Sequence, residues 1–240
     1  MDEARVNPLQ VNRRRPYVTY ALLGINIAVF LVEMVLEWSG MRHGEMLLRM
    51  GAKENTLITL GQYWRLLTAT FLHADWQHIL FNMIALYIWG PHLEALLGRA
   101  KMLVVYILSG ILGSLASYVF SLNVAVGASG SIFGCFGALL YFRTRHKQIF
   151  NQVFGLQVLV LIGMNLVNGF IIPGVDNYGH IGGLVGGFAM SCATGLYRER
   201  PTAVRVLALL GFAALCAGLF LFGMYRYSGA LGVPMFTVLA

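Results

Sequence analysis

The stretch YGHIGGLVGG, residues 178–187, is the part of the sequence that decides the fold. Two pairs of glycines in it lie four positions apart: Gly182 with Gly186, and Gly183 with Gly187. On a helix such residues share a face, and in membranes small residues at this spacing let two helix backbones approach closely. The stretch therefore predicts a helix near residues 179–197 that packs tightly against a neighbour and carries His180 at its start.

The composition of the whole chain indicates that its solvent is a lipid bilayer. Of its 240 residues, 58% are hydrophobic and 11% are charged, with a mean hydropathy of +0.70, whereas an ordinary soluble domain is about a quarter charged. The formal charge of +7 comes from basic residues in short clusters between apolar runs, which indicates membrane topology rather than nucleic-acid binding. Three cysteines lie within apolar runs and fit no metal motif, so we expect buried free thiols: Cys135, Cys192 and Cys216.

Seven segments are candidate membrane spans, since a spanning helix needs about 20 predominantly apolar residues. They lie near residues 17–38, 77–97, 101–122, 129–143, 148–171, 179–197 and 203–225. The long first loop, residues 39–76, is neither a span nor a polar linker and predicts short amphipathic pieces at the membrane interface. We therefore predict an all-α membrane protein with a short N-terminal segment (1–16), a six-helix core (17–200), and a seventh span with a tail (201–240).

The distribution of Lys and Arg predicts the orientation. With the N-terminus in the cytoplasm, 12 of the 17 basic residues fall on the inner side, as the positive-inside rule requires, and the C-terminus falls outside. The run after Arg15 has no clear cleavage site, so we expect a retained first span and not a signal peptide. The short N-terminal segment favours a bacterial cytoplasmic membrane, and Gly229, Gly232 and Pro234 predict a disordered end after Arg226.

Ser129, in Gly127-Ala128-Ser129-Gly130, is the first candidate for chemistry. At a helix start it lies beside free backbone N–H groups and the positive end of the helix dipole, which together can hold an oxyanion. By itself the string is more typical of a helix cap. His180, which could equally be a satisfied interfacial group, is predicted at the same outer depth as Ser129. A serine needs a general base such as an imidazole to become a nucleophile, so the two together indicate nucleophilic catalysis.

His78 and Asn82 are the second candidate pair, because residues four apart share one helix face. Two side-chain donors beside the N–H groups near Ala128 would form an oxyanion hole, although they could equally serve hydrogen bonding between helices. A zinc site from His73, His78 and His180 is a rival, disfavoured because no HExxH pattern or carboxylate ligand accompanies them. We thus expect no metal and no cofactor.

Two acidic residues have architectural interpretations. Glu94 lies near the inner end of its span, far from Ser129, and is expected to bond free backbone N–H groups there. Asp176 precedes His180 by four residues and could orient it as a third catalytic member, but a solvated loop carboxylate is the better reading.

Taken together, these residues resemble one family, the rhomboid intramembrane serine proteases. The resemblance runs from about Gly51 to Leu196, and its parts come in order along the chain. They are Trp64-Arg65, His78 and Asn82, Gly90, Glu94 and Gly98, Gly127-Ala128-Ser129-Gly130, and Gly179-His180 with Gly183 and Gly187.

The resemblance implies a six-helix bundle with a seventh C-terminal helix, and a catalytic dyad without a third member. Ser129 would attack the scissile carbonyl and His180 would move the proton. The oxyanion would be bound by His78, Asn82 and backbone N–H groups near Ala128. Phe133 would stack on the catalytic histidine without donating a hydrogen bond. The structural support implied by the family pattern comes from Trp64, Arg65, Glu94, Gly127, Gly130, Phe133, Gly183 and Gly187.

The expected partners are single-span membrane proteins, cut within or next to their membrane segment, and the surrounding lipid; the sequence does not indicate an oligomeric state. One alternative is a catalytically inactive relative that binds membrane helices, although such proteins typically lack the serine or the histidine. A transporter would require charged residues along a pathway or two related halves, and the sequence has neither.

Overall fold

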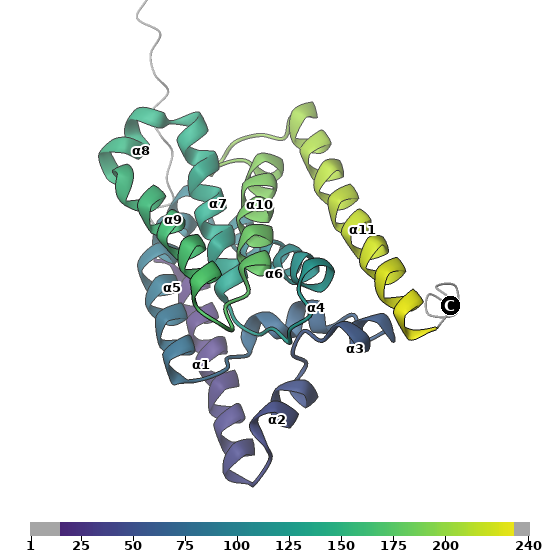
Figure 1. Cartoon of the computed structure of the whole chain (residues 1–240). Coiled ribbons are helices and arrows are strands. Elements are labelled where there is room, and N and C mark those ends of the chain that lie inside the picture. The colour runs from purple at the N-terminus through teal and green to yellow at the C-terminus, as the bar shows by residue number, and fades with distance from the viewer. Residues whose placement is uncertain (1–14, 233–240) are drawn as a thin grey trace, which may run out of the picture.

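The computed structural model describes residues 15–232, which fold into an all-helical bundle (Figure 1). The elements are α1 (Tyr17–Trp38), α2 (His43–Met50), α3 (Asn55–Thr59), α4 (Arg65–Thr68), the 3-10 turn η1 (Ala69–Phe71), α5 (Trp76–Leu97), α6 (Arg99–Phe120), α7 (Ser129–Arg145), α8 (Lys147–Val153), α9 (Gly155–Ile171), α10 (Asn177–Thr194) and α11 (Ala203–Leu231). The predicted segment 1–16 falls largely outside the described residues, as does the tail beyond Gly232.

Six of the seven expected spans coincide with single helices to within a few residues. The exception at one boundary is α11, which ends at Leu231 and not near residue 225. The expected span 148–171 is wrong as one helix: it is α8 followed by α9, bent by 80° at Phe154. Gly155, which begins α9, has a φ of +57°, a left-handed conformation that glycine adopts at little cost. An apolar run alone does not reveal such a bend.

The expected disordered end after Arg226 is wrong for residues 227–231, because α11 continues to Leu231. The helix is held there by the Arg226 guanidinium, which donates to Val119 O at 2.7 Å. The Tyr227 ring also packs on Tyr118, with 5.3 Å between ring centroids. Gly232, with a φ of +65°, then ends the helix as a left-handed cap.

Four helices of the described chain are long and apolar enough to cross a membrane, namely α1, α5, α6 and α11, and the bent pair α8–α9 brings the number to five. Neither α7 nor α10 meets this test. Both are rich in glycine and serine and pack mainly against protein in the middle of the bundle (Figure 1), where small residues serve close contact better than large apolar ones. The chain is an integral multi-pass membrane protein, and the division into a 17–200 core with an added helix stays a prediction.

The first loop forms three short helices and a 3-10 turn at one end of the bundle (Figure 1). Its apolar side chains at Met46, Leu47 and Ile58 are buried. The buried Arg65 guanidinium holds the loop together, donating to Leu48 O at 2.8 Å and to Ala52 O at 2.9 Å. Trp64, beside it, is 58% exposed, as expected of an aromatic residue at a membrane interface.

The opposite end of the bundle is joined by Glu94, as the sequence predicts. Its carboxylate accepts hydrogen bonds from the backbone N–H of Thr19 at 2.9 Å, from that of Val18 at 3.2 Å, and from the Thr19 hydroxyl at 3.0 Å. These N–H groups belong to the first turn of α1, where no earlier carbonyl can accept them. Glu94 therefore caps α1 from α5.

Candidate active site

Ser129 is the first residue of α7, and its position is set by the turn before it. Gly127 has a φ of +131°, which side chains rarely tolerate, and its N–H donates to Ala69 O at 2.9 Å. Ala128 is the buried N-cap residue. The backbone N–H groups of the first turn of α7 have no acceptor within the helix, so Ser129 lies beside free donors and the positive end of the helix dipole.

His180 lies in the first turn of α10, and its Nε2 is 2.9 Å from Ser129 Oγ. The side chain is buried, at 9% exposure. The neutral imidazole that accepts the serine proton at Nε2 carries its own hydrogen on Nδ1. Among the described residues Nδ1 has no hydrogen-bond partner. Serine and histidine are therefore within proton-transfer distance, without a visible third member.

The glycines of α10 explain why these two side chains meet. A Cβ at Gly183 would lie 2.0 Å from Gly130 O, and one at Gly187 would lie 1.8 Å from Gly134 O. The other pair faces α6, where a Cβ at Gly182 would lie 2.6 Å from the Ala116 Cβ. Helix α10 thus packs between α6 and α7 at backbone contact distance. This confirms the close packing predicted from the glycine spacing.

Phe133 stacks on the imidazole ring of His180. The two ring centroids are 4.3 Å apart and the planes differ by 9°. Phe133 is itself buried and stands one helical turn after Ser129, on the same face. The stack fixes the plane of the imidazole, and in that plane Nε2 faces the serine.

His78 and Asn82 point their donors at the turn before Ser129. A Cβ on Gly127 would meet His78 Nε2 at 2.6 Å and Asn82 Nδ2 at 3.7 Å. The N–H of Ala74 is 3.4 Å from His78 Nδ1 and directed at it, so the neutral ring carries its hydrogen on Nε2. Asn82 Nδ2 is buried and has no partner within residues 15–232. Asn82 Nδ2 is therefore a buried donor without a described partner, and His78 Nε2 lies with it at the turn where an oxyanion would form.

Asp176 makes no hydrogen bond to His180 Nδ1 in the described part of the chain. Its Oδ1 accepts the Gly179 N–H at 3.1 Å, so the residue is the N-cap of α10. The expectation of a merely solvated loop carboxylate is therefore wrong, because the group caps the helix that carries His180. A signal was present in the sequence: an aspartate just before a glycine-rich helix start is a typical cap.

A cavity of about 30 Å³ lies beside Ser129, lined by Gly127, Gly130, Gly179 and small residues of α6. That volume is enough for a water molecule. Within the described chain, two charged residues line it, Lys53 and Asp176. Lys53 is not predictable from the sequence, because a single lysine in a loop has no motif around it.

The rival zinc site is not preformed. Among the described residues, no group of three or more His, Cys, Asp or Glu side chains is arranged to hold a metal ion. His73 is fully buried, which lowers its pKa to about 3 and keeps the ring neutral. It contacts His78 edge-on, with 5.2 Å between ring centroids. The three cysteines form no disulfide, and Cys135 is buried while the other two are half-buried.

Comparison with known proteins places these elements in one family. The family model described as "Rhomboid domain" matches residues 60–197. The chain is 39% identical to the rhomboid protease GluP of Bacillus subtilis over 89% of its own length, and 36% identical to the putative rhomboid protease YdcA of that organism, of which it covers 74%. It is 30% identical to the rhomboid protease AarA of Providencia stuartii, covering 83% of that protein. It spans less than half of GluP, 42%.

Proposed function

We propose that this chain, which belongs to the rhomboid family, is an intramembrane serine protease with a Ser129–His180 dyad. The observation that carries the proposal is the 2.9 Å distance between Ser129 Oγ and His180 Nε2. It joins two helices that pack at backbone contact, so the pair is preorganised rather than incidental. The relatives bearing the name rhomboid protease support the same activity.

The first half of the reaction uses the groups around Ser129. Its Oγ bonds to the scissile carbonyl carbon as its proton passes to His180 Nε2. The carbonyl oxygen becomes an oxyanion that accepts hydrogen bonds from His78 Nε2, Asn82 Nδ2 and the backbone N–H groups near Ala128. His180 then donates its proton to the leaving nitrogen, the C–N bond breaks, and an acyl-enzyme remains on Ser129.

The second half needs water, which hydrocarbon excludes. The polar cavity beside Ser129 supplies a place for it. A water molecule loses its proton to His180 Nε2 and attacks the acyl carbon. Ser129 leaves and regains that proton, which restores the starting dyad. Non-helical backbone such as residues 121–128 is tolerable at membrane depth where it lines a cavity of this kind.

The substrates in this proposal are single-span membrane proteins, cut within or next to their membrane segment. The chain would lie in a bacterial cytoplasmic membrane with its N-terminus in the cytoplasm and its C-terminus outside. Ser129 and the first loop would then face the outer leaflet. Reporter fusions at each end would test the orientation, and a cytoplasmic reporter signal from the C-terminus would contradict it.

The activity is tested with purified protein in mild detergent and a model single-span substrate. Wild type and Asp176→Ala are expected to cleave, whereas Ser129→Ala and His180→Ala are expected not to. Cleavage by Ser129→Ala that stops on adding a chelator would overturn the serine mechanism and favour a metal. If none of the proteins, wild type included, cleaves any of several substrates, a helix-binding relative without activity would be favoured.

A further inference from the structure

Lys53 is a buried cation next to the proposed active site. It lies between α2 and α3 in the first loop, and only 1% of its surface is exposed. Its side chain lines the cavity that Ser129 also lines. Burying an ammonium group costs free energy unless its donors are satisfied and its charge is balanced. A lysine in this position is therefore expected to have a specific role.

Its hydrogen bonds to described residues all lead to one segment, residues 121–128, which we call the pre-nucleophile segment. The Lys53 ammonium donates to Asn123 O at 2.7 Å and to Ser121 O at 3.2 Å. The Lys53 backbone also pairs with Ala125, with both N–H to O distances at 3.0 Å. Asn55 adds a further bond from its amide to Ser121 O at 2.8 Å. The first loop thus holds the segment by side chain and backbone together.

The pre-nucleophile segment ends in the groups that would bind the oxyanion. Gly127 lies against His78 and Asn82, and Ala128 caps the helix that begins with Ser129. The segment itself contains no charged residue. A shift of its backbone would move Gly127 and Ala128 away from the donors of α5, and catalysis is sensitive to displacements of about 1 Å.

Two charged groups face the ammonium, Asp176 at the start of α10 and Glu54 next along the chain. Burial has the largest influence on the pKa of Lys53 and lowers it to about 8, although the attraction from both carboxylates raises it. Below that pH the group is an ammonium with three N–H donors. Hydrogen bonds from a charged donor are roughly twice as strong as neutral ones. The bonds from Lys53 to the pre-nucleophile segment therefore weaken when the ammonium loses its proton.

We propose that Lys53 is a positioning residue of the active site, whose ammonium holds the pre-nucleophile segment so that the oxyanion donors converge beside Ser129. It acts through the backbone of that segment and does not touch the reacting atoms. The proposal rests on the proposed function for its kinetic consequences. Its structural consequence, the ordering of residues 121–128, stands apart from any activity.

The pH dependence distinguishes a positioning role of Lys53 from a purely stabilising one, because rising pH should change activity and stability in opposite directions. Activity should fall as the pH rises through about 8, where Lys53 loses its proton. Stability should change the other way: the folded pKa lies below the ordinary value of 10.5, so between about pH 8 and 10.5 the unfolded chain binds more protons. Rising pH then favours the folded state as far as this group is concerned.

The test compares Lys53→Arg and Lys53→Met with wild type, using the single-span substrate in the same detergent. Lys53→Met should lower kcat about ten-fold or more with little change in KM, because only alignment is lost. Lys53→Arg should recover most of kcat and move the alkaline fall to higher pH, since arginine keeps its charge. Lys53→Met should show no fall centred near pH 8.

A matched control is Lys101→Met. Lys101 also donates to two loop carbonyls, Leu196 O at 2.6 Å and Gly195 O at 3.3 Å, but at the opposite end of the bundle. Its loss should lower the melting temperature and leave kcat unchanged. If Lys53→Met behaves like this control, Lys53 is a structural lysine and the proposal is overturned.

Hydrogen exchange followed by mass spectrometry reads the positioning without any substrate. Lys53→Met should speed exchange at residues 121–128 at least several-fold and leave α1 and α11 unchanged, whereas Lys53→Arg should not. If wild type fails to cleave, the proposed function fails, and exchange still decides whether Lys53 orders the segment. Unchanged exchange, or faster exchange with unaltered kcat in an active enzyme, would overturn the proposal.

Discussion

Two helices of this protein, α10 and α11, both pack on α6 but do so in different ways. The first approaches its neighbours at backbone contact along its length, through glycines whose Cβ atoms would collide with Gly130 O and Gly134 O. The second is longer, lies at one flank of the bundle against α10, α6 and α3, and exposes most of its apolar side chains (Figure 1). Phe212 and Met224 are its buried side chains in the core, and polar and aromatic contacts hold the regions near its two ends.

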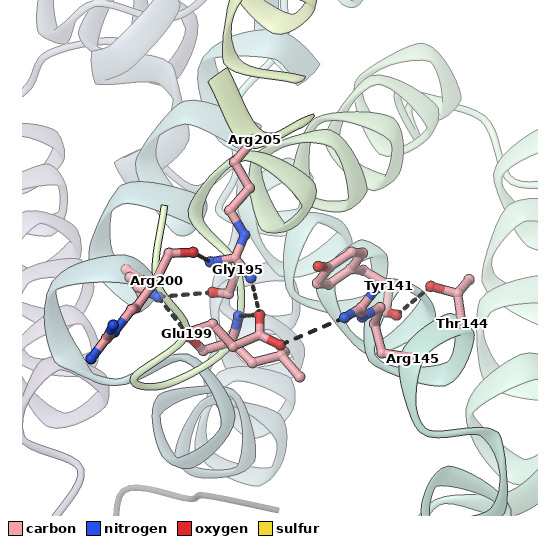
Figure 2. Close-up of polar contacts among 9 residues, drawn as sticks. Tyr141, Thr144, Arg145, Gly195, Glu199, Arg200 and Arg205 are labelled. Atoms are coloured by element: carbon pink, nitrogen blue, oxygen red, sulfur yellow. Dashed lines mark hydrogen bonds and ion pairs between the residues drawn. The ribbon is translucent and has the colours of Figure 1, made fainter. Parts of the chain in front are cut away.

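At the start of α11, Glu199 is the centre of a polar cluster (Figure 2). Its carboxylate accepts from the Arg205 guanidinium and from the Leu196 N–H, and it lies 4.0 Å from Arg145 of α7. Arg205 donates to Arg200 O as well. The cluster ties the α10–α11 linker to the start of α11 and to the end of α7, at the opposite end of α7 from Ser129.

Near the far end of α11 the contacts are aromatic. Gly223 lies against the Tyr118 ring, where an added Cβ would be 2.3 Å from Cε1, and the Tyr118 hydroxyl is 3.5 Å from Met224 Sδ. Tyr63, next to Trp64, packs edge-on against Phe220. Backbone contact is thus concentrated where Ser129 and His180 meet, whereas α11 is attached mainly through side chains.

The largest effect is expected from Gly187→Ala in α10. A Cβ there would lie 1.8 Å from Gly134 O and 2.5 Å from its Cα, so the helices must separate, at a cost of about 3 kcal/mol in the free energy of unfolding. Cleavage should be lost with it. The matched control is Gly218→Ala in α11, where no described atom lies within 4 Å and alanine favours the helix. Equal thermal stability of the two variants would contradict the difference in packing between α10 and α11.

The next effect falls on chemistry rather than packing. Asn82→Ala removes one proposed oxyanion donor and should lower kcat about a hundred-fold while the melting temperature changes little. Asn165→Ala in α9 is the control, because that amide is exposed and bonds only to Leu161 O in the described structure. Steady-state kinetics of the two variants checks the prediction. A kcat for Asn82→Ala within a few-fold of wild type would remove Asn82 from the oxyanion hole.

A smaller effect is expected at the cap of α10. Asp176→Ala loses the bond to the Gly179 N–H and should lower the free energy of unfolding by about 1 kcal/mol, whereas Asp176→Asn should retain the cap. Both should still cleave. Because Asp176 raises the pKa of Lys53, both should also move the alkaline fall of activity to lower pH. Loss of all cleavage would instead indicate a third catalytic member.

The smallest effect is expected from Glu199→Gln, which weakens the attachment of α11. A partly exposed ion pair contributes about 0.2–1 kcal/mol, so the melting temperature should fall slightly and kcat should not change. Glu45→Gln, which removes the exposed pair with Arg49, is the control and should cost no more. A large loss of activity in Glu199→Gln would mean that the attachment of α11 also positions α7 and α10, which would contradict the expected difference between α10 and α11.

Much of the geometry of the proposed active site was predictable from residues that follow a pattern. The four-residue glycine spacing in 178–187 predicted the tight helix, and the placement of Ser129, His180, His78 and Asn82 near helix starts predicted their convergence. Glu94 was predictable because a carboxylate near an inner helix end has free N–H groups to bond. In each case the signal is local, since helix periodicity determines which residues share a face.

The features that the sequence did not reveal depend on which loops meet in space. Lys53 and Ser121 are far apart in the chain, and no spacing rule joins them. The bend at Phe154 lies within a segment whose average hydropathy is that of one span. The position of α11, anchored by Glu199 and Tyr118, depends on contacts among three helices. Long-range packing of this kind is not encoded in a short motif, and only a structure shows it.

The most direct test of the central claim, a serine activated by His180, is covalent labelling with a fluorophosphonate followed by mass spectrometry of the adduct. It needs no natural substrate. We expect an adduct on Ser129 in wild type and in Asp176→Ala, and almost none in His180→Ala, because the hydroxyl then lacks its base. Labelling of His180→Ala at the wild-type rate, or cleavage by wild type without any adduct on Ser129, would contradict it.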